Sequence, residues 1–484
     1  PSPHRRCRDG PVLTRIEIDG FKTFRDFALD VSPFLVVLGR NAAGKSNLFD
    51  ALLFIGCLAD ESLLDAARHT RGDLADLFHR RVDGTRVDRM SFAVEVLLER
   101  SVTDAFGDTS KVGHSRLRYA LTIELRATPR GDRPFVSSES VTLIRQADDH
   151  WIAAFDRSLR RALAVYSTRS STDLLRTDTT DHDRPKFKLY QQGGAGRPRE
   201  LPANEATATV LSSLTTANEY PLLYALKQEL RSWRLLHLDP TALRSPDSFD
   251  DPDVLADNGA HLANSLRRIV QETGTEDRPD GVLNDLAADL AAVVPEVVGL
   301  RLSDDPARRQ RQVEVLTRDE TPFSARVASD GTLRAIALLA ALYDPHGAGL
   351  ICFEEPENGI FPQRLAQFVR HLRTLASRSV TRRLSDDQAR LTQLILSSHS
   401  PTILRALRDV DDAGTRTDVV FADMSTRTRR GEARSRVSRI RRVLAADQLS
   451  LEYDVGAVVS PAEIAEFEVT ESLWDGCPGT SPQR

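Results

Sequence analysis

Hydrophobic and polar positions follow two different periods along the chain. Alternation, or a short continuous apolar run, predicts strands at 13–19, 27–31, 34–38, 92–97, 117–125, 141–144, 297–302, 313–316, 350–353, 394–396 and 419–424. A spacing of three to four residues predicts helices at 47–54, 203–216, 221–235, 259–271, 282–293 and 333–343. Turn-forming residues predict loops at 104–113 and 127–134. The pattern therefore predicts an α/β protein that also has an antiparallel β region.

Changes in the pattern divide the chain. We expect an N-terminal lobe over 12–165, an inserted flexible and helical subdomain over 166–300, a C-terminal lobe over 301–445 and an extension over 446–484. The insertion begins with a polar stretch, 167–200, which we expect to be flexible. The strands near 300 and 315 are expected to return the chain to the core sheet. The first eleven residues and the tail from Gly476 are expected to be disordered.

Composition restricts the class of protein. The chain has 484 residues, of which 40% are hydrophobic, and this is enough for a substantial core. Its 65 basic and 70 acidic residues leave a net charge of −5, so no overall positive field draws it to nucleic acid or membrane. The four cysteines show no metal-binding spacing and predict free thiols in a cytoplasmic protein. The longest apolar run, nine residues at 335–343, is too short to span a bilayer.

The stretch from Gly39 to Ser46, G-R-N-A-A-G-K-S, fits the phosphate-loop pattern between a strand and a helix. Such a loop directs backbone N–H groups and a helix N-terminus at one anion. Lys45 would reach the outer phosphates of ATP, and the Ser46 hydroxyl would hold Mg²⁺. We predict nucleotide binding by Gly39, Asn41, Ala42, Ala43, Gly44, Lys45, Ser46 and Asn47.

A second motif supplies carboxylates. The apolar strand 350–353 runs into Glu354-Glu355-Pro356-Glu357, the Walker B form. Glu354 would take the metal side, and Glu355 would orient the attacking water beside the γ-phosphate. An ordinary acidic turn after a strand is the alternative. The phosphate loop upstream favours the functional interpretation.

Two further segments could complete the site. Ser329-Asp330-Gly331-Thr332 precedes an apolar helix, and its hydroxyls and N–H groups could grip a phosphate of a second chain, although a simple helix N-cap explains it equally well. His399 follows a buried strand, where ligands bind in open α/β sheets, and could sense the γ-phosphate. A structural histidine is the alternative. Lys22 and Arg25 are weaker candidates, because a solvated strand face accounts for both.

The spacing of the phosphate loop, S-D-G-T-L-R, E-E-P-E-N-G and S-S-H-S-P resembles the ABC-type ATPase heads of the SMC/RecF class. More narrowly, it is similar to bacterial predicted ATPases related to the ATPase half of OLD-family nucleases. The resemblance covers about residues 12–425. It implies a P-loop NTPase that dimerises head to head around two Mg-ATP, with Ser329 and Gly331 facing the partner's phosphate loop. Glu355 would be the catalytic base, His399 the switch residue and 356–359 the segment at the dimer axis.

The chain departs from transporter-type heads in three places. The metal-side acid is Glu354 rather than Asp, the signature is A-S-D-G-T, and no glutamine occurs between Ser46 and Arg145. The ligand that such a glutamine would supply is left unassigned. Together with the lack of a membrane segment, these differences argue against a transporter engine.

Arginines crowd the stretch Arg427–Arg442, with one acid among them. They could neutralise nucleic-acid phosphates, although a solvated arginine-rich hairpin is slightly favoured. No acidic cluster follows His399, so an appended Toprim nuclease is not expected. The resemblance implies an ATPase in DNA-linked or antiphage-defence work with a separately encoded effector, as a homodimer or higher oligomer. A nucleotide-dependent scaffold with slow hydrolysis is the alternative, and a nuclease in its own right is less favoured.

Overall fold

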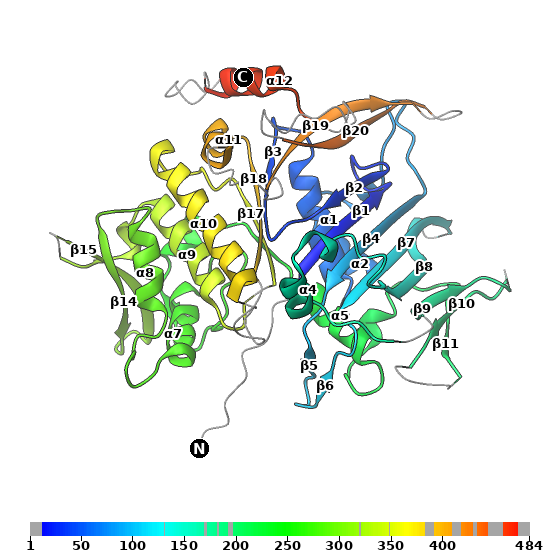
Figure 1. The fold of residues 1–484 in the computed structure, drawn as a ribbon, viewed down its shortest axis with the longest axis horizontal. Coiled ribbons are helices and arrows are strands. Elements are labelled where there is room, and N and C mark those ends of the chain that lie inside the picture. Colours follow the sequence, from blue (N-terminus) through cyan, green and yellow to red (C-terminus); the bar gives the residue numbers. More distant parts are fainter. Residues whose placement is uncertain are drawn as a thin grey trace.

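The fold is taken from a computed structural model, shown in Figure 1. It describes residues 12–129, 131–168, 172–181, 183–191, 197–318, 321–347, 349–382, 392–408, 418–428, 433–443 and 458–472. The predictions for the first eleven residues and for the tail from Gly476 lie outside these ranges.

A six-stranded sheet forms the centre of the molecule. Its strands, in spatial order, are β12 (Arg234–Leu236), β17 (Leu350–Glu354), β18 (Gln393–Ser398), β3 (Phe34–Leu38), β19 (Val419–Arg427) and β20 (Ser435–Arg442). The first five are parallel and β20 is antiparallel to β19. In Figure 1 this sheet stands between two groups of elements, an antiparallel β lobe and a mainly helical lobe.

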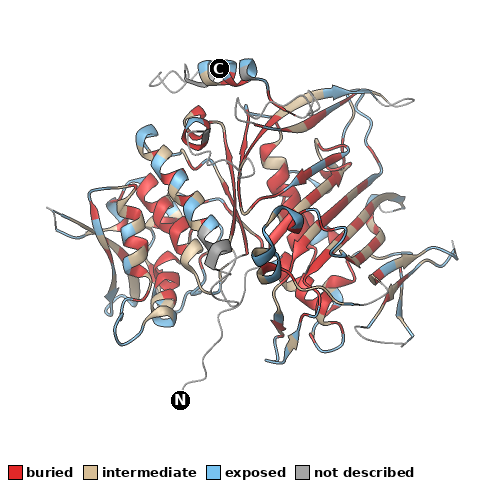
Figure 2. Cartoon of the chain, in the orientation of Figure 1, coloured by how far each residue is buried: buried red, intermediate tan, exposed pale blue. Residues whose placement is uncertain are grey.

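Both faces of the central sheet are buried, which explains its continuous apolar strands. Along β3, Leu35 and Val37 belong to the core of the antiparallel lobe, whereas Val36 and Leu38 belong to the core of the helical lobe. Figure 2 shows buried residues along the sheet and along the helices that cover it. The sheet therefore belongs to both cores at once.

Strand β3 is held by strands from the far end of the chain. It pairs with β18 on one side and with β19 on the other. The fully buried side chain of Gln393, at the start of β18, accepts a hydrogen bond from Leu13 N (3.0 Å) and donates to Leu13 O (2.8 Å) and Ser32 O (2.9 Å). Residues 13, 32 and 393, far apart along the chain, thus meet beside the strand that leads to the phosphate loop.

The antiparallel lobe is built on an eight-stranded sheet. In spatial order its strands are β11 (Arg199–Pro202), β10 (Lys186–Leu189), β9 (Asp173–Asp178), β8 (Gly131–Leu143), β7 (Arg116–Thr128), β4 (Arg89–Leu97), β1 (Val12–Asp19) and β2 (Phe27–Asp30). The prediction of a flexible stretch over 167–200 was wrong for the described residues, since β9, β10 and β11 extend this sheet. The loop predicted at 127–134 is largely strand. The loop predicted at 104–113 contains the turn of a hairpin and its second strand, β6 (Thr109–Lys111), whereas the first strand, β5 (Ser101–Thr103), precedes it.

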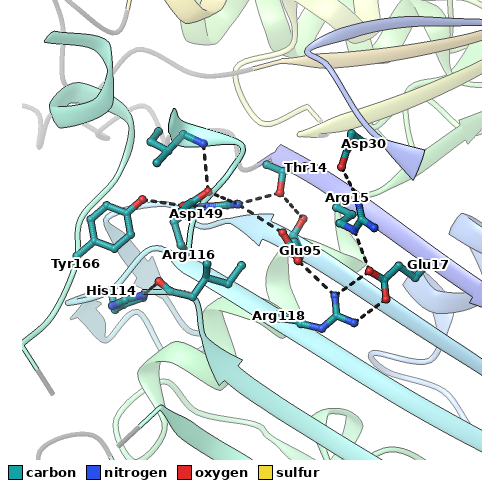
Figure 3. Close-up of polar contacts among 12 residues, drawn as sticks. Thr14, Arg15, Glu17, Asp30, Glu95, His114, Arg116, Arg118, Asp149 and Tyr166 are labelled. Atoms are coloured by element: carbon teal, nitrogen blue, oxygen red, sulfur yellow. Dashed lines mark hydrogen bonds and ion pairs between the residues drawn. The ribbon is translucent and has the colours of Figure 1, made fainter. Parts of the chain in front are cut away.

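A buried ion cluster lies in this lobe (Figure 3). Arg116 is fully buried, and its guanidinium binds Asp149 through two nitrogens, at 2.6 Å from Nε to Oδ2 and 3.1 Å from Nη2 to Oδ1. Thr14 Oγ1 accepts a third bond from Arg116 (3.0 Å), and Tyr166 Oη donates to Asp149 Oδ2 (2.7 Å). The arginine also lies over the ring of Trp151. This cluster ties β1, β7 and the segment after β8 together.

The helical lobe carries a small sheet of its own: β13 (Asp247–Ser248), β15 (Gln310–Thr317), β14 (Val297–Asp305) and β16 (Phe323–Ser324). The strands predicted near 300 and 315 exist, but the expectation that they join the core sheet was wrong. They pair with each other and pack against α7 and α8. Strand pairing across a separate sheet cannot be read from alternation alone, because alternation does not name the partner.

The helices are α1 (Lys45–Cys57), α2 (Leu63–Arg68), α3 (Leu74–Leu77), α4 (Arg157–Leu163), α5 (Pro221–Arg231), α6 (Pro240–Arg244), α7 (Leu262–Thr273), α8 (Leu283–Ala291), α9 (Asp330–Tyr343), α10 (Pro362–Arg382), α11 (Pro401–Arg408) and α12 (Pro461–Ser472). The helix predicted at 203–216 was wrong, since only one 3₁₀ turn forms there, at Leu211–Ser213. The helix predicted at 221–235 ends at Arg231, because the next residues enter β12. No described helix combines the length and the apolar character needed to cross a bilayer.

Candidate functional site

Three loops that carry predicted residues meet at one edge of the central sheet. Strands β17, β18 and β3 are parallel neighbours, with Glu354 paired to Ser397 and Ser398 paired to Leu38. The segments that follow Leu38, Ser398 and Glu354 therefore leave the sheet side by side. This is the edge at which ligands bind in open α/β sheets.

The phosphate loop has the geometry of an anion cradle. Gly44 is the N-cap of α1 with φ 92°, and the first turn of this helix has neither a side-chain cap nor an acidic residue. A Cβ at Gly44 would lie 1.9 Å from Ser438 Oγ, so glycine is required both by the backbone and by the neighbouring strand β20. The helix N-terminus is thus available to a negatively charged ligand.

The Lys45 side chain lies against the phosphate loop. Its side chain is buried, and Nζ donates to Gly39 O (2.5 Å) and Arg40 O (3.0 Å). Asn47, also predicted to bind nucleotide, instead donates from Nδ2 to Thr23 Oγ1 (2.8 Å). The Thr23 hydroxyl also lies 2.6 Å from Ser438 Oγ. Asn47 and Ser438 therefore both contact the Thr23 hydroxyl, which lies beside the phosphate loop.

Arg71 joins the phosphate loop to the acidic segment. Its Nη2 donates to Ser46 O (2.9 Å) and to Glu354 Oε1 (3.4 Å), and its Nε donates to Asp50 Oδ1 (3.2 Å). The two predicted metal-side residues, Ser46 and Glu354, are consequently held by one guanidinium. On its other side, Glu354 Oε2 lies 3.6 Å from Nδ1 of His237, which follows β12.

Glu355 is oriented differently from Glu354. It has φ 51°, a conformation that costs an ordinary residue free energy, and its side chain is exposed. Its backbone N–H donates to Ser397 O (2.9 Å), and its Oε2 accepts from Asn358 Nδ2 (2.8 Å). Side chains alternate between the two faces of a regular strand, and β17 ends at Glu354. The left-handed backbone at Glu355 breaks this alternation, so strand geometry does not set the direction of its carboxylate.

His399 is held by Glu357. One carboxylate oxygen, Oε1, accepts from His399 N (3.1 Å) and from Ser398 Oγ (2.7 Å), and lies 3.2 Å from His399 Nδ1. The imidazole is partly exposed, at 29% of its side-chain surface. The backbone of His399 is therefore held by the acid that follows Glu355 by two residues, and the ring lies beside the same carboxylate.

Ser329 and Gly331 lie in the helical lobe, at the start of α9. The Ser329 hydroxyl accepts from Thr332 N (3.2 Å) and so caps α9. This helix packs against α6, α7 and α8. A Cβ at Gly331 would lie 2.0 Å from Gly359 O, so the first turn of α9 touches the segment that follows Glu355. The cap predicted as an alternative is present.

The comparison with protein families agrees with this geometry. Residues 34–405 match the family described as "AAA domain, putative AbiEii toxin, Type IV TA system". The chain belongs to this AAA family. The predicted fold class, a P-loop NTPase of the ABC-head type, is confirmed. No curated protein matches the chain.

Three solved SMC head domains are similar to this AAA-family chain. One is bound to the C-winged helix domain of ScpA, with 12% identity, 90% of this chain and 99% of that chain covered, and a TM-score of 0.45. A Pyrococcus furiosus head with an extended coiled coil, bound to the C-terminal domain of ScpA, has 11% identity, coverage of 89% and 96%, and a TM-score of 0.44. The Thermotoga maritima head has 10% identity, coverage of 90% and 99%, and a TM-score of 0.37.

The residues of this AAA-family chain fit Mg-ATP as a ligand. The uncapped N-terminus of α1 and the Lys45 ammonium suit phosphate oxygens. The Ser46 hydroxyl and the Glu354 carboxylate are oxygen ligands of the kind that Mg²⁺ prefers. When bound, Mg²⁺ would neutralise charge on the outer phosphates. The place of the missing glutamine ligand stays unassigned.

The other charged candidates have protein partners. Lys22 Nζ lies 2.5 Å from Asp50 Oδ2, and Arg25 Nε lies 3.1 Å from Asp19 Oδ1. In the arginine-rich stretch, Arg439, Arg441 and Arg442 make ion pairs. Arg427, Arg434 and Arg436 are exposed, while Arg429 and Arg430 lie outside the described residues. Nucleic-acid binding there stays a prediction.

Sequence reasoning missed two residues of the site. Arg71 lies in no motif, since it follows a short helix far from both Ser46 and Glu354 along the chain. No local signal could have identified it. Glu357 belongs to the E-E-P-E-N-G motif, which the sequence shows. Its contact with His399, however, depends on the pairing of β17 with β18, which the motif does not indicate.

Proposed function

We propose that the protein hydrolyses ATP in the presence of Mg²⁺ and uses the reaction to reset a conformational switch. The observation that carries the proposal is the guanidinium of Arg71, which contacts both Ser46 O and Glu354. The phosphate loop and the Walker B acids leave the same edge of the sheet, because β3 and β17 run parallel on either side of β18. Lys45 would hold the outer phosphates, and Ser46 and Glu354 would hold the metal.

The two neighbouring glutamates have different roles in this proposal. Glu354 is engaged by Arg71 and lies near His237, which suits a residue that holds a cation. Glu355 is exposed and oriented by Asn358, so its carboxylate would accept a proton from the attacking water. His399 would contact the γ-phosphate, because Glu357 fixes the imidazole at the same edge.

Hydrolysis would take place in a dimer. Ser329 and Gly331 lie in a different lobe from α1, so their contact with a phosphate would be to the loop of a second copy (Figure 1). Two apolar side chains flank this turn: Val327 is 74% exposed and Phe361 is 67% exposed. Exposed apolar groups on both sides of a phosphate-binding turn support self-association there.

The biological output is proposed from the family. Its description names a toxin of a type IV toxin–antitoxin system, which supports work in antiphage defence or a DNA-linked process with a separately encoded effector. The exposed arginines of β19 and β20 would supply nucleic-acid contacts. The second candidate is a scaffold whose slow hydrolysis times partner assembly. Stimulation of turnover by DNA would favour the first candidate.

The test compares Glu355→Gln with Lys45→Ala. We expect Glu355→Gln to lower turnover by roughly 10²–10⁴-fold, because the proton acceptor is lost, while ATP binding persists. Its mass in solution should double on addition of Mg-ATP. Lys45→Ala should lose both ATP binding and dimer formation. Glu296→Gln, a surface carboxylate change, is the matched control and should behave as wild type. Normal turnover by Glu355→Gln would overturn the assignment of the base.

A further inference from the structure

A thiol, a carboxylate and an imidazole converge beyond the C-terminal end of α1. Cys57 is the last residue of this helix, Glu61 lies in the turn that follows, and His69 ends α2. One ligand atom from each residue lies within 4.8 Å of the other two. His69 Nε2 is 3.0 Å from Glu61 Oε2 and 3.2 Å from Oε1. The three groups come from a stretch of thirteen residues folded back on itself.

The donor set is specific in its chemistry. A sulfur, a nitrogen and an oxygen donor suit Zn²⁺, which accepts all three kinds of ligand in tetrahedral sites. Mg²⁺ and Ca²⁺ prefer oxygen ligands alone. Three protein ligands also leave a fourth position for water or for another residue. The site therefore differs from the proposed ATP site in the ion that it would select.

We propose that Cys57, Glu61 and His69 bind one Zn²⁺ ion. On binding, the Cys57 thiol loses its proton to solvent and coordinates as the thiolate, and His69 coordinates as the neutral imidazole. No oxidant or reductant is needed.

The electrostatic surroundings support the site. Burial raises the pKa of the Cys57 thiol to about 12, and the negative charges of Glu61 and Asp257 add to this effect. The negative charges of Glu61 and Asp257 near the thiol would favour a divalent cation. A bound cation reverses the effect on the thiol, because its own charge is the largest in the site.

A second group among the described residues, Asp247, Asp251 and His261, carries less weight. Asp247 Oδ2 accepts from Asn264 N (2.9 Å), and Asp251 Oδ2 accepts from Ser248 N (2.7 Å). These carboxylates thus already serve the backbone at the start of α7 and the turn after β13. This group offers a matched control for the first one.

The position of the proposed zinc site gives it a consequence. The ion would join the end of α1 to the end of α2, two residues before Arg71. Arg71 is the residue that contacts Ser46 and Glu354. Zinc would therefore fix the segment between the two helices and limit the positions open to that guanidinium.

The experiment uses the full chain, freed of metal with a chelator and measured without nucleotide or Mg²⁺. Calorimetric titration with Zn²⁺ should give one ion per chain. Titration with Co²⁺ should give a near-ultraviolet charge-transfer band, which reports a thiolate ligand. Cys57→Ser should abolish the band, and Cys57→Ser and His69→Ala should each weaken binding at least about tenfold.

Two controls make the result specific. Asp251→Asn removes a ligand of the second group, and Cys477→Ser removes a different thiol, so both should retain wild-type binding. The His69 side chain is half exposed, so His69→Ala is expected to remain folded and to test the site if Cys57→Ser does not. A wild-type chain without the band, a band that survives Cys57→Ser, or binding abolished by Asp251→Asn alone would overturn the proposal. Because nucleotide is absent, none of these outcomes bears on ATP hydrolysis.

Discussion

Two clusters of charged residues in the molecule are built in opposite ways. In the antiparallel lobe, Arg116 and Asp149 are fully buried and bind each other through two hydrogen bonds (Figure 3). At the edge of the central sheet, Arg71 is 55% exposed in its side chain and divides its contacts among Ser46, Asp50 and Glu354. The Arg116 guanidinium is buried with one carboxylate hydrogen-bonded through two of its nitrogens, whereas the Arg71 guanidinium is half exposed and reaches two carboxylates.

This difference separates a structural cluster from a binding site. A buried charge pair must be complete, because removing one partner leaves the other charged and desolvated. An exposed pair contributes little to stability, and its members are able to change partners when a ligand arrives. We therefore expect substitutions in the first region to act on folding, and substitutions in the second to act on nucleotide binding.

The largest effect on stability is expected for Asp149→Ala. The carboxylate also accepts from Tyr166 Oη and Ile152 N, so its removal strands a buried guanidinium and two further donors. We expect a loss of about 3–5 kcal/mol in the free energy of unfolding, measured by urea denaturation. Asp148→Ala, at the exposed neighbouring position, should cost less than about 0.5 kcal/mol. A small loss at Asp149 would contradict a structural role for the cluster.

The pH dependence of the same cluster has a definite sign. Burial by itself would raise the pKa of Asp149, but the hydrogen bonds and charge of Arg116 outweigh it, and the pKa lies below its ordinary value. The stability from this group is therefore present at neutral pH and is lost as the pH falls through the lowered pKa. Lowering the pH should therefore lower the stability of the antiparallel lobe.

Glu139 gives the next effect, with the opposite sign. Burial raises the pKa of this carboxyl to about 7, although Val210 N and Leu211 N donate to it. Between its ordinary pKa and 7 the unfolded chain has lost this proton and the folded chain retains it, so stability falls as the pH rises through that range. The free energy of unfolding should fall by about 3 kcal/mol across this pH range.

Glu139→Gln tests this assignment. Urea denaturation of wild type between about pH 5 and 8 should show this fall in stability, and the neutral amide of Glu139→Gln should remove it. Glu124→Gln, on the neighbouring strand, alters a carboxyl whose pKa is lowered, and it should leave the fall in place. If the free energy of unfolding of Glu139→Gln still fell with pH as in wild type, another group would be responsible for the titration.

Arg71→Ala should have the smallest effect on folding. The guanidinium is half exposed, and its buried partner Asp50 keeps an ion pair with Lys22, so we expect the free energy of unfolding to change by less than about 1 kcal/mol. The KM for ATP should rise roughly fivefold, equivalent to about 1 kcal/mol, because two carboxylates near the phosphates lose a neutralising charge. Arg68→Ala, at the end of the preceding helix α2 and 78% exposed, is the control. A large loss of stability in Arg71→Ala would remove the contrast between the two regions.

The phosphate loop and the Walker B acids could be predicted because each is a short, contiguous motif. Strand, loop and helix around Lys45 follow from the local pattern. The three loops come together because their strands run parallel, and the sequence indicated this only through the apolar runs that precede Gly39, Glu354 and His399. The division into domains and the roles of individual site residues stay predictions.

The errors arose where distant contacts decide local structure. In the segment predicted as a helix at 203–216, Thr209 donates to Leu58 O, and the backbone of Val210 and Leu211 donates to Glu139. The two backbone N–H groups are ones that a helix would use, and the Thr209 bond ties the segment to the end of α1. The polar strand β9 lacks a strong apolar pattern, and it forms because the edge of β8 offers a partner.

The position of β3 between two strands from the end of the chain bears on how the protein is made. A ribosome completes residues 34–38 long before β18 and β19, and at about 5–20 residues per second the delay amounts to tens of seconds. Until then the apolar strand lacks both neighbours, and the buried hydrogen bonds of Gln393 to Leu13 and Ser32 cannot form. The nascent chain would therefore need protection from aggregation, and the proposed ATP site would form only after β18 and β19 have been made.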